Sequence, residues 1–421
     1  VNVKIWKEHY TAVFRANQVL DNIDKVTFSS DTHKNDLVGQ VKFLRSFYYF
    51  YLTALWDNIP LVLKTSSAAD QPAQKTPDEI FTQLETDLTD AIAKLPSTRN
   101  TSEYGRPTKG SAYALLAKVY MQHHKYPDAI KCFEWLVDGE GKNYYDLTSN
   151  YGDNFSNKTE NNKESLYEIQ FSLMNRVGFD QTDNYRDPNA QLGTQIEMNQ
   201  APAGVGWDNI EARRWLVDYY KREKTVDNKN DIRLFYSVWY DQAGTDFPDR
   251  PDTMIYGAKW RNDWGSRVFI KKYSTDANPL YYWNDNNFRS LRYADILLLY
   301  AEALNEVNGP TAKAVECVNR VRQRVNLPTL ENSTYYNGAL ITTDKTAFRE
   351  HVKIERGLEL SLECVRWIDL KRWGLDDQAT INELKSRDDD FSNFVIGKSS
   401  RMPLPQTEVD NNPNLHQNPR Y

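Results

Sequence analysis

Apolar residues recur every three or four positions near the start of the chain, which is the spacing of one face of a helix. Residues 4–24 follow this spacing, and residues 35–56 follow it more strongly. Pro60 stops the second helix, because proline cannot continue the helical hydrogen bonds. The pattern therefore predicts two long helices, followed by a short strand or extended segment at 59–63.

A further helix is predicted to begin after Thr76, whose hydroxyl can cap the free N–H groups of a helical first turn. Pro77 suits the first helical position, and Glu79 can complete a capping box. This helix is expected to run to about Leu95, and the next one spans about 108–123.

Helical pairs recur along the chain. Residues 126–133 read as the second helix of one pair, and residues 297–318 contain another pair joined by an Asn-Gly-Pro turn. Residues 129–133 (AIKCF) and 314–318 (AVECV) match within these pairs. Antiparallel pairs of this size resemble tetratricopeptide repeats, which bury their faces only against neighbouring repeats. We therefore expect a mainly α fold built on several stacked helical pairs.

The middle of the chain, residues 141–285, breaks this regularity. It is rich in Asn, Asp, Gly, Tyr and Trp, with short strand-like pieces at 166–171 and 267–273. Such long irregular stretches are usually functional, and binding residues often lie on loops held by a rigid scaffold. We interpret the chain as one domain with a loop-rich insertion that carries the ligand face. The domain spans 1–421, its helical-repeat scaffold comprises 1–140 and 286–374, and 375–421 form a C-terminal extended segment.

Residues 344–374 are the most charged helical stretch. Glu355, Glu359 and Glu363 lie four residues apart on one face, with several arginines nearby. Three carboxylates in a row could serve acid–base chemistry or bind a metal. We favour a salt-bridged face that fixes this helix to a neighbour.

Composition argues against several classes of function. The formal charge is −6, with 52 basic and 58 acidic residues, and the basic residues form no stripe for a phosphate backbone, so nucleic acid is not expected as a partner. Cys132, Cys317 and Cys364 lie in apolar helical contexts and are predicted to be buried free thiols. No apolar stretch is long enough to span a membrane. The chain starts inside a helical pattern, and we interpret it as a fragment or a processed form.

Motifs for catalysis and cofactors are missing from the sequence. It contains no HExxH, no CxxC, no P-loop, no GxGxxG after a strand and no GxSxG elbow. We therefore predict no catalytic residues, no metal site and no cofactor. A glycosidase needs only two carboxylates across a cleft, and the sequence marks no such pair.

Aromatic residues beside amides and charges distinguish the insertion. Trp207 lies on a glycine-rich turn before a helix, so its ring has little local cover. The C–H face of a sugar packs on an indole or a phenol, while amide and charged side chains satisfy its hydroxyl groups. We therefore predict a glycan-binding surface. Its candidate ligand-binding residues are Tyr185, Arg186, Trp207, Asn209, Trp264 and Trp283.

Several long strings, in the same order along the chain, resemble the SusD/RagB family of Bacteroidetes. The string at 291–303 (LRYADILLLYAEA) is similar to the most recognisable string of that family, and residues 402–421 are similar to its C-terminal ending. Further matches lie at 41–62, 105–112 and 355–373.

The resemblance implies a tetratricopeptide-like scaffold with a variable face and no catalysis. It also implies a surface-exposed lipoprotein of the cell outer membrane that caps a SusC-like TonB-dependent transporter and delivers oligosaccharide to it. In the starch-binding member, a Trp on the loop before a helix of the insertion and an earlier Tyr contact sugar. Trp207 and Tyr185 are the matching positions.

Departures from the family pattern are few. Cys364 and Arg420 stand where the family usually has glycine. The lipid-bearing cysteine of the family and the residues after it are missing from the front of this chain. Membrane attachment is therefore expected through an N-terminal lipid outside this chain, and part of the sugar site is expected to be missing with it.

Alternatives to a glycan-binding import component stay open. One is a protein-interaction scaffold or a peptide-binding RagB-like component. Another, which we rank last, is a glycoside hydrolase. Stacking on aromatic rings tolerates many sugars and linkages, so the prediction is of a glycan in general.

Overall fold

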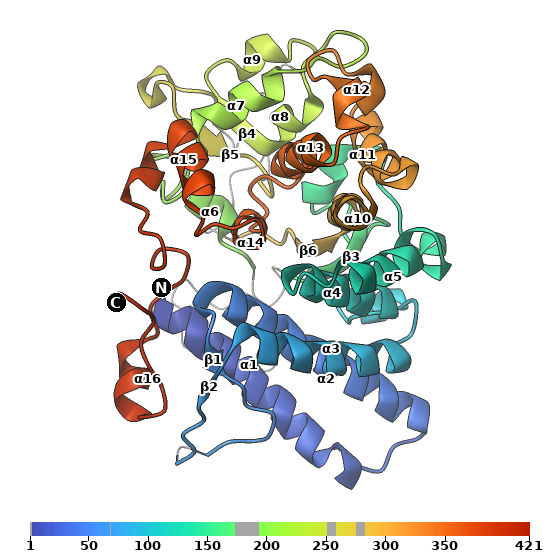
Figure 1. The fold of residues 1–421 in the computed structure, drawn as a ribbon, viewed down its shortest axis with the longest axis vertical. Helices are drawn as coiled ribbons and strands as arrows, with labels where there is room; N and C mark the ends of the chain where they lie inside the picture. Colours follow the sequence, from blue (N-terminus) through green and yellow to red (C-terminus); the bar gives the residue numbers. More distant parts are fainter. Residues whose placement is uncertain (1, 68, 173–192, 251–257, 275–282) are drawn as a thin grey trace. The chain divides into compact units, whose positions relative to one another are not determined.

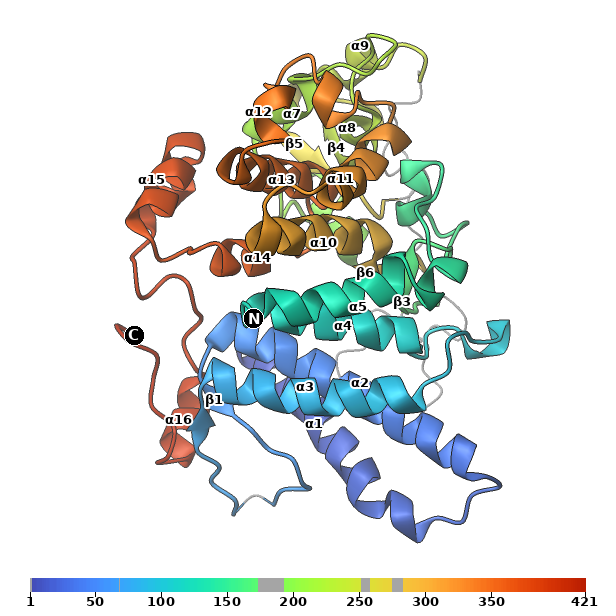
Figure 2. The same ribbon diagram turned by 45° about the vertical axis from the view of Figure 1, so that its right-hand side comes forward.

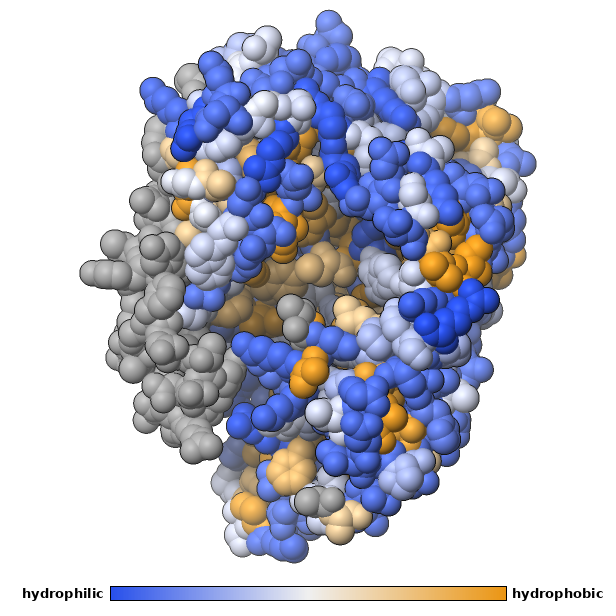
Figure 3. All heavy atoms as spheres, turned by 90° about the vertical axis from the view of Figure 1, so that its left-hand side faces the viewer, coloured by the Kyte–Doolittle hydropathy of each residue, from blue (hydrophilic) through white to orange (hydrophobic). Residues whose placement is uncertain are grey.

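The computed structural model describes residues 2–67, 69–172, 193–250, 258–274 and 283–421. These residues form two compact units. Unit 1 comprises Val1–Tyr144 and Trp367–Tyr421, and unit 2 comprises Tyr145–Arg366. Within the described ranges, every helix is too short or too polar to span a bilayer. On the face drawn in Figure 3, hydrophilic residues predominate and apolar residues occur in smaller groups.

Unit 1 is built on successive helices, each packed against the next (Figures 1 and 2). Their apolar faces supply the core, as the spacing of the sequence predicts. Thr76 accepts a hydrogen bond from the N–H of Glu79, and the Glu79 carboxylate accepts one from the N–H of Thr76, which confirms the predicted capping box. The helices are α1 (Asn2–Asn22), α2 (Asp31–Trp56), α3 (Pro77–Lys94), α4 (Lys109–Gln122) and α5 (Tyr126–Val137), with short 3₁₀ helices at Ile23–Lys25, Thr101–Glu103 and Glu140–Asn143.

The C-terminal part of unit 1 is held to the end of α2. The Trp56 indole donates to the carbonyl of Pro403 at 2.9 Å, and the Asn418 amide donates to the carbonyl of Trp56 at 3.0 Å. Further elements of this part and of the α2–α3 connection are short. They are β1 (Ile59–Pro60) paired antiparallel with β2 (Gln74–Lys75), α14 (Arg366–Arg372), α15 (Gln378–Arg387), a 3₁₀ helix at Asp389–Asn393 and α16 (Gln406–Asn411).

Unit 2 combines longer helices with short strands and loops. Helix α10 (Tyr293–Asn308) packs on α11 (Ala312–Arg324) and on α13 (Lys345–Glu359). Strand β3 (Ser165–Ile169) pairs antiparallel with β6 (Phe288–Arg292), and β4 (Val238–Tyr240) pairs antiparallel with β5 (Val268–Ile270). The remaining elements are α6 (Ile196–Gln200), α7 (Arg214–Lys221), α8 (Ile232–Ser237), α9 (Ala243–Asp246), α12 (Gly338–Ile341) and 3₁₀ helices at Tyr151–Phe155, Asn262–Trp264 and Leu330–Asn332.

The mainly α fold with a few short strands is confirmed, with two local corrections. The charged stretch at 344–374 is not one helix, because α13 ends at Glu359 and a turn separates it from α14. Cys132 and Cys317 are buried, but Cys364 is exposed, so that part of the thiol prediction is wrong. Cys364 lies in this turn at φ 62°, which takes its side chain away from the helical face assumed for it.

Candidate functional site

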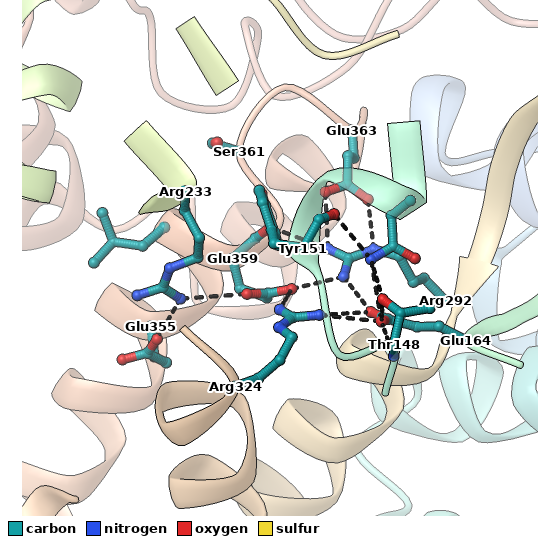
Figure 4. A network of polar contacts seen from close by, with 12 residues as sticks. Thr148, Tyr151, Glu164, Arg233, Arg292, Arg324, Glu355, Glu359, Ser361 and Glu363 are labelled. Atoms are coloured by element: carbon teal, nitrogen blue, oxygen red, sulfur yellow. Dashed lines mark hydrogen bonds and ion pairs between the residues drawn. The ribbon is translucent and has the colours of Figure 1, made fainter. Parts of the chain in front are cut away.

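The carboxylate of Glu359 lies at the centre of a buried charge network in unit 2 (Figure 4). Glu359 is the last residue of α13 and is fully buried. Its carboxylate accepts hydrogen bonds from Arg324 at 2.5 Å, from Arg292 at 2.6 Å and from Arg233 at 3.3 Å. These arginines come from α11, β6 and α8, so one carboxylate joins four elements.

The neighbouring carboxylates extend this network. Glu355, one turn earlier on α13, accepts from Arg233 at 2.6 Å and from Arg322 at 3.2 Å. Glu363, in the turn after α13, accepts from Lys272 at 2.7 Å. All of these side chains are buried, so each charge depends on its partners rather than on water.

The C-terminal end of α13 is closed by the same network. The last carbonyl groups of a helix have no partner inside the helix. Here the carbonyl of Glu359 accepts from the hydroxyl of Tyr151 at 3.0 Å and from the ammonium of Lys272 at 3.2 Å. The carbonyl of Leu358 accepts from the hydroxyl of Tyr220 at 2.6 Å. A 3₁₀ helix, helix α7 and the turn after β5 are therefore tied directly to the end of α13.

The electrostatics of this network decide between the two interpretations of the glutamates. Burial alone would raise the pKa of Glu359, but Arg324, Arg292 and Arg233 lower it well below its ordinary value. Burial alone would also raise the pKa of Glu355. The charge of Arg233 outweighs burial, and the pKa of Glu355 ends far below its ordinary value. Carboxylates held this firmly in the charged form are poor proton donors. The salt-bridged interpretation is confirmed.

A second candidate site is the loop that carries Trp207. Trp207 is 37% exposed although its backbone is fixed, since its N–H donates to the carbonyl of Met198 at 2.8 Å. The next N–H, of Asp208, donates to the carbonyl of Ala201 at 2.9 Å. Both acceptors belong to α6 or follow it directly, so this short helix presents the indole ring.

Glycine is required at two positions just before Trp207, for different reasons. Gly204 has φ +85°, a conformation that L side chains rarely adopt. A Cβ on Gly206 would lie 2.4 Å from the Cβ of Ala201, so no side chain fits there. The tight approach of the loop to α6 therefore depends on these glycines, and the ring of Trp207 is presented on a defined backbone.

Asn209 lies two residues after Trp207, and its N–H donates to the carbonyl of Asn199 in α6 at 3.1 Å. It is exposed, and its amide donates to the side-chain oxygen of Asn199 at 2.8 Å. Ile210, which sequence reasoning did not identify, is 51% exposed beside it. Arg267 fixes the same loop by donating to Asp208 at 2.9 Å, a contact that the sequence gives no signal for.

Trp283 is joined to the same helix through its neighbour. It is half-buried, and the following residue, Asn284, pairs in a β-bridge with Thr194 just before α6. The amide of Asn284 also donates to the buried carboxylate of Glu197 at 2.6 Å. The segments that carry Trp207, Asn209 and Trp283 are thus anchored on one short helix.

Trp264 is placed differently from the other candidates. It is 5% exposed and packs edge-to-face on Trp239, Trp260 and Phe269, with ring centroids 5.2–5.7 Å apart. A buried ring has no face left for a sugar, so Trp264 belongs to the core of unit 2. Tyr185 and Arg186 lie outside the described residues. Among the residues that the structure does describe, no group of three or more His, Cys, Asp or Glu side chains could hold a metal ion.

Comparisons with known proteins match both the sequence and the fold. The sequence profile of the SusD family matches residues 163–421, and a profile described as starch-binding associating with outer membrane matches residues 1–121. SusD-like protein P25 of Formosa agariphila is 26% identical and is aligned over 97% of this chain and 77% of its own length.

Solved structures are similar over nearly the whole chain. A SusD superfamily protein from Bacteroides vulgatus has a TM-score of 0.81 and 26% identity, over 99% of this chain and 84% of its own. Surface glycan-binding protein A from Bacteroides thetaiotaomicron, in complex with laminarihexaose, has a TM-score of 0.75 and 25% identity, over 98% and 85% of the two chains.

Proposed function

The chain belongs to the SusD family, and we propose that it binds a glycan through the Trp207 loop without cleaving it. The observation that carries this proposal is the exposed indole of Trp207, held on α6 by backbone hydrogen bonds. A ring presented in this way can pack on the C–H face of a sugar without ordering cost in the loop. A similar structure, the surface glycan-binding protein of Bacteroides thetaiotaomicron, holds laminarihexaose.

The polar part of the proposed site comes from neighbours of the indole. Asn209 supplies an exposed amide, and Trp283 adds a second, half-buried ring anchored on the same helix. Tyr185 and Arg186 stay in the proposal from the sequence alone. Amide and guanidinium groups can satisfy sugar hydroxyls, while the rings supply apolar contact.

We propose that the protein is not an enzyme, because its three most conspicuous carboxylates are occupied by fixed cations. Glu355, Glu359 and Glu363 are each within 3.0 Å of an arginine or lysine nitrogen. Incubation with polysaccharides should therefore release no new reducing ends, and their appearance would contradict the proposal.

We further propose that the bound glycan passes to a SusC-like TonB-dependent transporter, with the protein attached to the outer membrane by a lipid. The outer-membrane description of the profile that matches residues 1–121 supports this step. A SusC-like barrel should co-purify with the tagged protein from membranes of its native host. Its absence under mild detergent extraction would argue against the transport step and leave glycan binding unaffected.

The test of the site is affinity electrophoresis in gels that contain a polysaccharide, beginning with laminarin and starch. Trp207→Ala should weaken the retardation, and the apparent affinity obtained from it should fall at least tenfold, because stacking supplies most of the apolar contact. Tyr104→Ala is the matched control, because Tyr104 is 47% exposed and lies in unit 1. Retardation of the Trp207 variant equal to wild type would refute the site.

A further inference from the structure

An arginine on the surface of unit 2 is held between two tyrosine rings. The guanidinium of Arg222, at the C-terminal end of α7, lies 3.4 Å from the ring centre of Tyr219 and 5.9 Å from that of Tyr335. Arg222 is half-buried, whereas Tyr335 is 52% exposed. The two rings fix the plane of the guanidinium and leave an aromatic face beside it open to solvent.

Arg222 differs from most arginines of unit 2 in the groups that surround its charge. Arg233, Arg292 and Arg324 each bind carboxylates in the buried network. No carboxylate of the described residues lies within ion-pair distance of Arg222, not even that of Asp218, one turn earlier on α7. A guanidinium ordered by stacking but without an anion is prepared for one from outside.

The adjacent carboxylate is already used elsewhere. Glu223 accepts from Arg322 at 2.7 Å, from the hydroxyl of Ser333 at 2.7 Å and from the N–H of Thr334 at 3.0 Å. These contacts hold the loop that presents Tyr335. The acidic residue next to Arg222 in the sequence therefore builds the platform and leaves the charge of Arg222 uncompensated.

The platform continues into the core of unit 2. The ring of Tyr336 packs edge-to-face on Tyr335 at 4.8 Å and on the buried ring of His351 at 4.8 Å. Burial raises the pKa of Tyr336 to about 12, and the Arg222 charge acts against that shift. The exposed ring thus stands on packed aromatic side chains, which limits its motion.

We propose that Arg222, Tyr219 and Tyr335 form a second sugar-binding platform that selects an acidic sugar, one that carries a carboxylate or a sulfate ester. The planar guanidinium can bind either anion through two parallel N–H donors. The exposed ring of Tyr335 supplies the apolar face that a pyranose needs. This inference rests on the proposed glycan function and adds a charge preference to it.

The experiment measures binding of the whole chain to three size-matched probes by calorimetry. The probes are a carboxylated oligogalacturonate, a sulfated dextran oligosaccharide and neutral laminarihexaose. Wild type should bind at least one acidic probe, and Arg222→Gln should weaken that binding at least tenfold. Arg222→Lys should also weaken it severalfold, since it keeps the charge but loses the paired donors and the stacking. The two acidic probes separate the carboxylate from the sulfate.

Controls separate this inference from the general function. Arg250→Gln removes the same charge from an arginine that lies over Phe235 and Tyr236, whose rings are half-buried and offer no exposed face to a sugar, and should leave binding unchanged. Tyr335→Ala should weaken acidic binding without changing the melting temperature by more than a few degrees, because the ring is exposed. If the Arg222→Gln variant binds the acidic probe as tightly as wild type does, the inference is overturned.

Three further outcomes would also overturn it. If neutral laminarihexaose binds and depends on Trp207 while neither acidic probe binds, only the charge preference fails. If no glycan binds at all, the proposed function fails with it. If a polyglutamate peptide binds through Arg222 and acidic sugars do not, the platform recognises a protein instead.

Discussion

The two units of this protein bury charge in opposite ways. In unit 1, the guanidinium of Arg45 meets the single carboxylate of Asp87 at 2.7 Å, inside a core of long apolar helices. In unit 2, Glu359 shares its carboxylate with three arginines, and the same arginines reach further carboxylates. Unit 1 is therefore held mainly by apolar faces, and unit 2 depends on a charge network among short elements.

This difference explains where binding surfaces can be placed. Long helices bury a continuous apolar face and need little from loops. In unit 2, buried ion pairs fix α8, β6 and α11 to α13, and these elements in turn hold the loops between them. Both proposed sugar surfaces, at Trp207 and at Tyr335, lie in unit 2. A rigid network beneath variable loops permits a precise site without regular structure.

Breaking the network should have the largest effect on stability. Glu359→Gln removes the central carboxylate charge and leaves buried guanidinium groups unbalanced, at a cost of about 3–5 kcal/mol. Chemical denaturation measures the loss, and hydrogen exchange followed by mass spectrometry should locate it in peptides from 145–366. Glu316→Gln, on the exposed side of α11, is the control and should be nearly neutral. A loss spread equally over both units would contradict the comparison.

The counterpart in unit 1 is an apolar truncation. Leu84 is fully buried on α3, and Leu84→Ala should cost about 2–5 kcal/mol through lost burial and the cavity left behind. Faster hydrogen exchange is expected in peptides from 1–144. Thr86→Ala, on the exposed face of the same helix, should change stability by less than about 0.5 kcal/mol. Equal effects of the two substitutions would mean that this face does not supply the core.

Unit 1 could be predicted from sequence because its signals are local. The apolar spacing of α1 and α2 repeats within a few residues, and the capping box at Thr76 needs only its own first turn. The bounds predicted for α3 and α4 also lie close to those observed. These features depend on neighbours in the chain, which periodicity reports directly.

Unit 2 could be predicted only in part because its contacts join distant residues. The charged face of Glu355 and Glu359 was visible, but Arg233 and Arg292 as partners were not, since they are separated from Glu359 by long stretches of chain. Trp264 and Trp207 have similar local sequence, rich in Asn, Asp and Gly. Only packing on Trp239 and Trp260 makes the first a core residue.

Acid should act in opposite directions on the buried ion-paired carboxylates of the two units, which are Glu355 and Glu359 in unit 2 and Asp87 in unit 1. The pKa values of Glu355 and Glu359 are lowered in the fold, mainly because their arginine partners outweigh burial, so their stabilisation is lost as pH falls below about 4.5. For each proton that the protein takes up on unfolding, the free energy of unfolding falls by about 1.4 kcal/mol for every unit that the pH is lowered. Burial instead raises the pKa of Asp87 in unit 1, so this carboxylate gives no such loss. Hydrogen exchange at pH 3–5, corrected for intrinsic rates, should show unit 2 opening first. Opening of unit 1 before unit 2 would contradict this assignment.

The smallest effect is expected at two residues, one in each unit, that stand where the family usually has glycine. Cys364 in unit 2 has φ 62° and Arg420 in unit 1 has φ 68°, and such conformations cost an L residue about 1–2 kcal/mol. Cys364→Gly should therefore raise the free energy of unfolding by up to about 1 kcal/mol, after the greater freedom of glycine in the unfolded chain is counted. Arg420→Gly should gain less, because the Arg420 guanidinium also donates to the carbonyl of Ile396 at 2.8 Å. Cys364→Ala is the control in the same denaturation experiment, since it removes the thiol but keeps the strained backbone. A gain from alanine equal to that from glycine would show that the side chain, and not the backbone, was responsible.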